Sequence, residues 1–218
     1  MKAQQASIDS KRKQIQKYEK LYALEGFDYA PVIIKHYMML IHLLIEQNRY
    51  RSANQYATRV LRIFLDYQQD LMYNLVPGLD FIHMNDRMLY HMHDPVFGMM
   101  YYYLGLLIMK TKTKTGLERH VDNALAILTY NNQKLSNFYR RILFQTIELK
   151  QKLLPIDHLD QIQLLKRKRK LFRDISHLCQ TALEFGDLYL SLNNQVQANR
   201  WYRKASKYTN TDERIQFP

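Results

Sequence analysis

Short polar connections between long stretches of helical pattern constrain this chain more than any other sequence feature. The connections are residues 48–49, 111–116 and 193–195, and apolar side chains around them recur at intervals of three and four. Two helices joined by so few residues must pack antiparallel, so the helical hairpin is the expected building unit. Six glycines and five prolines leave little turn chemistry for a fold of many strands. The sequence therefore predicts an all-α fold.

Four prolines divide the helical pattern into segments. Pro31, Pro77, Pro95 and Pro155 each disfavour helix at the preceding residue and are unsuited to a helix interior. We expect about ten helices between and around these breaks. Their expected ranges are 8–24, 32–46, 50–74, 79–92, 96–110, 117–130, 134–153, 157–173, 175–192 and 195–208. The expected domains are a basic helical segment at 1–30, a helical domain at 31–208 and a tail at 209–218.

Three small residues in the last two expected helices indicate a closely packed helix pair. Glycine in a helix interior costs about 1 kcal/mol relative to alanine, so Gly186 needs a packing reason. Ala198 and Ala205 lie seven residues apart and share one face of the following helix. We expect these residues to let the two backbones approach closely. The aromatic side chains expected in the same contact are Phe185, Tyr189 and Tyr202.

The spacing of these small residues resembles the tetratricopeptide repeat, a helix-turn-helix unit of about 34 residues. Gly186 and Ala205 are nineteen residues apart, and the same separation joins Gly105 to Ala124. The resemblance implies helical hairpins stacked as an irregular α-solenoid. Such an array has a concave surface that binds peptides or segments of other proteins.

A third match, at residues 34–66, and several departures make the resemblance degenerate. Tyr50 and Ala53 stand where the repeat has its turn tyrosine and the alanine that follows. Ile41 replaces the first small residue of this unit, and Leu117 replaces an alanine of the middle one. The units begin near residues 34, 98 and 179, and each lacks the closing proline. The resemblance is therefore to an irregular array.

The resemblance implies a non-catalytic protein that binds a peptide or protein partner, in regulation or signalling. The chain is also similar to the receptor domain of the peptide-sensing regulators of Gram-positive bacteria. Those regulators carry an N-terminal DNA-binding domain, for which residues 1–30 are too short, so this chain would be a receptor or antagonist without a DNA reader. The partner-binding groove positions carried over from the repeat are Lys35, Met38, His42, Ile45, Met99, Tyr102, Leu106, Met109 and Asp187.

A dense basic run at residues 164–173 supports an alternative function. The net charge of +12 favours encounter with polyanions, and this run could place cations against phosphates. The chain would then be a basic helical protein that binds RNA or DNA, although no recognisable nucleic-acid-binding motif accompanies the run. An ordinary solvated helix face is the third interpretation. The cations are Lys166, Arg167, Lys168, Arg169, Lys170 and Arg173.

The candidate metal ligands and nucleophiles of the chain lack the spacing of known sites. Residues 83–94 are rich in histidine and aspartate, but His91 and His93 are two apart and would point to different sides of a helix. Cys179 and His177 have the same spacing, and no phosphate loop or nucleophile elbow is evident. We therefore expect no enzyme activity, no cofactor, no metal site and no catalytic residue.

Cysteine content and hydropathy bear on the compartment. A single cysteine excludes an intramolecular disulfide, and the first twenty residues lack the apolar stretch of a secretory signal. The apolar runs fall short of the roughly 20 residues that cross a bilayer. We expect a cytoplasmic protein without a membrane span. The sequence leaves the oligomeric state open, a homodimer included.

Overall fold

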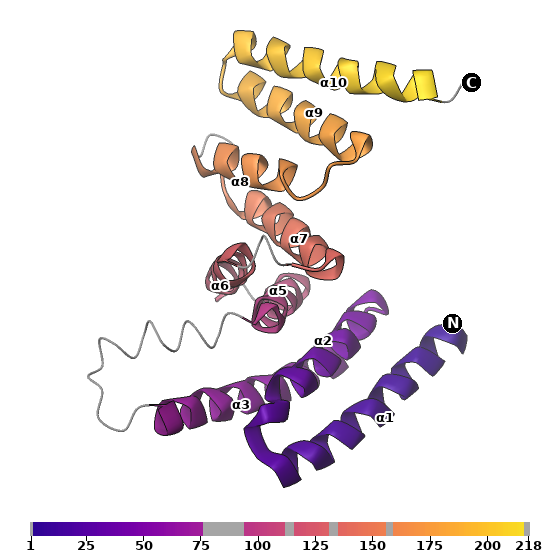
Figure 1. Ribbon diagram of the computed structural model, residues 1–218, viewed down its shortest axis with the longest axis vertical. Helices are drawn as coiled ribbons and strands as arrows, with labels where there is room; N and C mark the ends of the chain where they lie inside the picture. Colours follow the sequence, from indigo (N-terminus) through magenta and orange to yellow (C-terminus); the bar gives the residue numbers. More distant parts are fainter. Residues whose placement is uncertain (1, 76–93, 112–115, 131–134, 156–158, 216–218) are drawn as a thin grey trace. The chain divides into compact units, whose positions relative to one another are not determined.

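The computed structural model describes residues 2–75, 94–111, 116–130, 135–155 and 159–215. Every regular element in these ranges is a helix, which confirms the all-α class (Figure 1). The helix expected at 79–92 lies outside the described residues. Contacts divide the chain into two units, Met1–Leu143 and Phe144–Pro218, and each is described by itself. The domain boundaries expected at residues 31 and 209 stay a prediction.

The helices agree closely with the expected ranges. Unit 1 contains α1 (Lys2–Glu25), the 3-10 helix η1 (Gly26–Tyr29), α2 (Ala30–Glu46), α3 (Tyr50–Leu75), α5 (Pro95–Lys110) and α6 (Leu117–Tyr130). Unit 2 contains α8 (Leu159–Arg169), α9 (Ile175–Ser191) and α10 (Gln195–Ile215), and the unit boundary falls inside α7 (Asn137–Leu153). The main differences are that α1 begins six residues early, α8 ends four residues early and α10 continues seven residues further.

Local chemistry explains several helix ends. Pro31 and Pro95 occupy the first turns of α2 and α5, where a missing backbone N–H costs nothing. The hairpins α2–α3 and α9–α10 close with the same turn, in which Asn48 and Asn193 adopt left-handed φ values of 57° and 55°. The backbone N–H of the residue after each asparagine donates at 2.8 Å to the carbonyl oxygen five residues earlier. This pattern satisfies carbonyls that the helix end leaves free.

The core of unit 1 lies around α2 and α5. Helix α2 packs against α1, α3 and α5, and α5 packs also against α6. Ten of the sixteen residues of α5 are buried, because this helix is apolar on nearly all sides and has neighbours on several of them. Helix α1 adds Ile8 and Ile15 to the buried set.

Helices α9 and α10 of unit 2 pack side by side as a hairpin (Figure 1). The close approach expected at Gly186 is confirmed within this hairpin. A Cβ at this position would lie 2.3 Å from Cε1 of Tyr202, closer than real carbon atoms approach. Ala198 and Ala205 are buried in the same hairpin. The Phe185 ring is buried and stacks on the only tryptophan of the chain, Trp201, with a centroid separation of 4.2 Å.

Candidate functional site

An open cavity of about 460 Å³ lies beside three helices of unit 2. Helices α7, α8 and α9 each supply part of its wall, so the cavity depends on how these helices pack. Its lining residues are Glu148, Gln151, Lys152, Gln161, Leu165, Lys168, Glu184, Asp187, Leu188 and Ser191.

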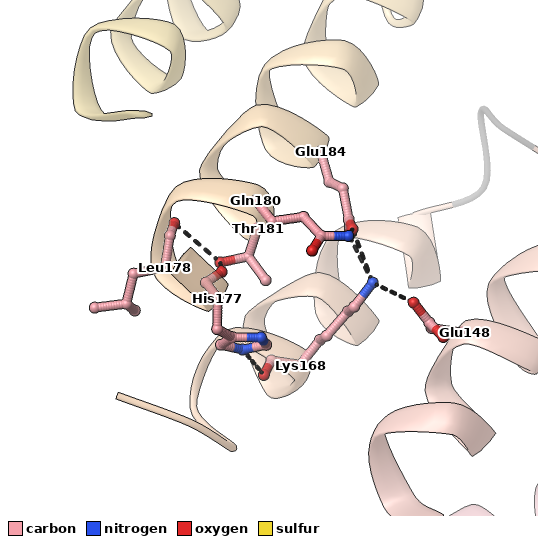
Figure 2. A network of polar contacts seen from close by, with 7 residues as sticks. All are labelled: Glu148, Lys168, His177, Leu178, Gln180, Thr181 and Glu184. Carbon is pink, nitrogen blue, oxygen red and sulfur yellow. Dashed lines mark hydrogen bonds and ion pairs between the residues drawn. The ribbon is translucent and has the colours of Figure 1, made fainter. Parts of the chain in front are cut away.

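Lys168 of α8 holds the three helices together at this cavity. Only 2% of the residue is exposed, and its Nζ donates to Glu148 Oε1 at 3.1 Å (Figure 2). The same Nζ donates to both carboxylate oxygens of Glu184 at 2.9 Å and lies 4.7 Å from the centroid of the Phe144 ring. An ammonium group tolerates burial only when such partners replace water. Lys168 therefore ties α8 to α7 and α9 through two carboxylates.

The periodicity of α8 explains why this lysine points inward. Gln161, Leu164, Leu165 and Lys168 are all buried and recur at intervals of three and four, so they form one stripe along α8. The side-chain amide of Gln161 donates to the backbone carbonyl of Gln151 at 2.9 Å, near the end of α7 where carbonyls lack helical partners. Lys168 thus belongs to the face of α8 that packs on the unit.

A second set of hydrogen bonds orients the backbone around Lys168. His177 Nε2 lies 2.9 Å from the Lys168 carbonyl oxygen (Figure 2). A carbonyl oxygen can only accept, so this imidazole nitrogen carries the hydrogen. The His177 ring also makes edge contacts with Phe144 and Phe172, at centroid separations of 5.5 Å and 5.2 Å. The Thr181 hydroxyl donates to the His177 carbonyl at 2.9 Å. These contacts link the start of α9 to the end of α8.

The cavity combines an apolar floor with a slight excess of negative charge. Leu165 and Leu188 are buried and belong to an apolar cluster with Phe185. Three carboxylates face two ammonium groups, which leaves one negative charge in excess. Such a site suits an apolar group that has a cation beside it. The charged members are Glu148, Glu184, Asp187, Lys152 and Lys168.

Four of the predicted groove residues are buried inside unit 1. Met38 and Met99 are 0% exposed, and Tyr102 and Ile45 are also buried, so these four belong to the core of unit 1. They face neighbouring helices because α2 and α5 have partners on several sides. Only Asp187 lines the unit 2 cavity, where its Oδ1 accepts a hydrogen bond from Tyr202 at 2.7 Å. The predicted groove residues of unit 1 that keep some exposure are Lys35, His42, Leu106 and Met109.

The predicted basic run is divided in the same way. Lys168 does not belong to an exposed basic face, because it is buried and paired with two glutamates. Arg169 is half-buried, and its Nη2 donates to the Tyr208 hydroxyl at 2.9 Å. The cations of the run that are exposed are Lys166, Arg167, Lys170 and Arg173.

Cys179 and Asp94, which the sequence also singled out, make contacts within their own hairpin or helix end. Cys179 is half-buried, and its thiol donates to the Ala205 carbonyl oxygen at 3.6 Å. Asp94 caps α5 by accepting the Val96 N–H at 2.8 Å. Residues 83–93 lie outside the described part, and within the described part no group of three potential metal ligands occurs.

Sequence reasoning missed Glu148, Glu184 and Gln161 as members of a site. A usable signal was present for Lys168, since it lies three and four residues after Leu165 and Leu164 and so continues their apolar stripe. No sequence signal identifies which carboxylates of α7 and α9 meet it, because that choice depends on tertiary packing.

In the described residues, no helix is both long and apolar enough to span a bilayer. Comparison with family models, curated proteins and solved structures finds no match to this chain.

Proposed function

We propose that this protein is a non-catalytic binding protein that holds a peptide or a segment of a protein partner in the cavity of unit 2. The observation that carries the proposal is the cavity itself. It has an apolar floor and charged walls, and Lys168 fixes its three helices through contacts of 3.1 Å and 2.9 Å. Binding to a preformed site of this kind loses little conformational entropy, because its side chains are already ordered.

Two hairpins with matching features support the tetratricopeptide-like assignment within this proposal. The turn residues Asn48 and Asn193 are 145 positions apart, and the same offset relates Ala53 to Ala198. Both alanines are buried, and each follows its turn at the same distance. Equivalent turns and equivalent small residues are expected of diverged copies of one repeat. Asp187 is the one groove position of the repeat that lines the proposed binding site.

The dimensions and charge of the cavity define the ligand. A volume of about 460 Å³ accommodates part of an extended peptide, such as one large side chain with its neighbours. Leu165 and Leu188 favour an apolar side chain, whereas the excess carboxylate favours a lysine, an arginine or a terminal amine beside it. We propose a peptide segment that combines an apolar residue with a cationic group.

Selection from random peptides displayed on phage tests the proposal with the whole chain as bait. Ser191 is exposed at the edge of the cavity, so Ser191→Trp should fill the site and reduce binding of selected peptides at least tenfold. Ser206 is exposed on α10 and does not line the cavity, so Ser206→Trp is the matched control. Asp187→Asn should lower the binding affinity of peptides that carry a cation more than that of peptides without one.

The proposal fails if the selected peptides bind the Ser191→Trp variant as tightly as the original chain. It also fails if selection yields acidic peptides or no peptide above background. Melting curves of both tryptophan variants separate loss of the site from loss of the fold.

A further inference from the structure

We propose that the outer face of α10 is a second binding site, which takes the phosphate backbone of a nucleic acid. This site is independent of the proposed peptide cavity. A shallow cavity of about 530 Å³ runs along this face, and no carboxylate lines it. Its cations are Arg200, Arg203, Lys204 and Lys207.

The four cations form a continuous positive strip. Their spacing of three, one and three residues places them on one side of α10 over about 10 Å of helix length. Within the part of the chain that the structure describes, no carboxylate forms an ion pair with Arg200 or Arg203. Their charge is therefore available to an external anion.

Trp201 connects this strip to the basic run of α8. Lys204 Nζ lies 3.9 Å from the centroid of the Trp201 ring, and the guanidinium carbon of Arg169 lies 5.4 Å from it. Arg169 is also held by its 2.9 Å hydrogen bond to Tyr208. The tryptophan itself is fixed by stacking on Phe185. Arg169 of α8 and Lys204 of the α10 strip thus meet at one aromatic residue, Trp201.

The chemistry of the face favours a chain of phosphates over other polyanionic partners. Among the α10 side chains that the structure describes, residues 195–209, the small apolar residues Ala198 and Ala205 are buried, so this part of α10 presents no broad apolar face to a membrane. Among the residues lining the strip, Val196 is the exposed large apolar side chain, at 79% exposure, which is too little for the apolar centre of a protein interface. Two guanidinium groups and two ammonium groups match phosphate oxygens. Contacts of this kind position a backbone without reading its sequence.

Fluorescence anisotropy with a short labelled DNA duplex and a single-stranded RNA of mixed sequence tests the assignment. The test variant carries Arg200→Gln, Arg203→Gln, Lys204→Gln and Lys207→Gln. The control removes the same charge from exposed sites of unit 1, through Lys13→Gln, Lys17→Gln, Lys20→Gln and Lys35→Gln. Both variants are compared with the original chain over a range of salt concentrations.

Phosphate contacts from Arg200 and Arg203 alone contribute about −1.8 to the slope of log K against log salt on duplex DNA. The α10 variant should therefore lose at least tenfold in affinity at low salt and most of this slope, while the control keeps both. Preference for duplex or for RNA then tells which nucleic acid supplies the phosphates.

Equal losses in the two variants would overturn the site, because net charge alone would explain the binding. Absence of binding by the original chain at low salt would overturn it as well. Tighter binding to polyglutamate or to phosphatidylserine vesicles than to either nucleic acid would reject the assigned partner. If circular dichroism shows that the fourfold variant is unfolded, the anisotropy measurement is made with the double variant Arg200→Gln/Arg203→Gln, which alters exposed side chains alone. Unchanged affinity of a folded double variant would then overturn the site.

Discussion

Substitution of Gly186 by alanine tests the helix contact at the centre of the α9–α10 hairpin. An alanine Cβ at this position would lie 2.3 Å from Cε1 and 2.6 Å from Cδ1 of Tyr202. Gly105 of α5 is the matched control, because the repeat template gives it the same position. The nearest atom to a Cβ at Gly105 is Cγ2 of Val121 at 3.4 Å, which is close to an ordinary contact.

The two substitutions should change stability in opposite directions. Alanine in place of glycine in a helix interior stabilises by about 1 kcal/mol. At Gly186 the Tyr202 ring must also move, and overpacking of this kind costs about 1–3 kcal/mol. Movement of the ring also disturbs the 2.7 Å hydrogen bond from Tyr202 to Asp187. We expect Gly186→Ala to lower the free energy of unfolding by about 1 kcal/mol and Gly105→Ala to raise it by up to about 1 kcal/mol.

Trp201 provides the assay, since it is the only tryptophan and stacks on Phe185 within the hairpin. Urea unfolding followed by its fluorescence should give a lower midpoint for Gly186→Ala than for the original chain. Circular dichroism should show an unchanged or higher midpoint for Gly105→Ala.

An unchanged or raised midpoint for Gly186→Ala would refute the close-approach argument. A further variant separates the steric cause from others. In a Tyr202→Ala background the ring is absent, so Gly186→Ala should stabilise the chain there by about the helix-propensity difference of 1 kcal/mol. Destabilisation in that background would show that another contact opposes the Cβ.

Two further predictions concern buried or half-buried titratable groups. Lys168→Met should lower the free energy of unfolding by about 2–3 kcal/mol, less than a fully buried pair would cost, because the side chains of Glu148 and Glu184 keep 36% and 28% exposure. When Glu148→Gln and Glu184→Gln are added to Lys168→Met, the urea midpoint should return most of the way to that of the original chain. A midpoint that stays as low as in Lys168→Met alone would contradict the assigned pairing. Burial, with smaller contributions from Lys11 and Lys35, lowers the pKa of His36, so protonation favours the unfolded chain and stability should fall as pH decreases through about 6.5. His36→Gln should reduce this pH dependence of the urea midpoint, and an unaltered dependence would count against the shift.

Helix boundaries were predictable because their causes are local. Proline in a first turn and asparagine in a left-handed turn act through the backbone of a few neighbouring residues, as at Pro95 and Asn193. The contact at Gly186 was predictable for a related reason, since glycine in a helix is unfavourable unless something approaches it. The expectation named the aromatic Tyr202 as a neighbour, and the structure confirms it.

The site was less predictable, because it depends on which helices become neighbours. Met38 and Met99 occupy positions that face a groove in the repeat template, yet both are fully buried here. The run around Lys168 indicated one basic face, and the structure instead turns this lysine inward toward carboxylates from two other helices. A stripe of apolar residues shows that a helix face is buried, but it does not show what covers that face.

The sequence by itself determined the all-α class, most helix ends and the close contact at Gly186, because propensity, turn chemistry and side-chain volume act over a few residues. Only the tertiary structure decided that Lys168 bridges Glu148 and Glu184 and that a cavity opens beside this bridge. Those contacts join residues 16 and 20 positions apart on three helices, and their formation depends on the packing of whole helices.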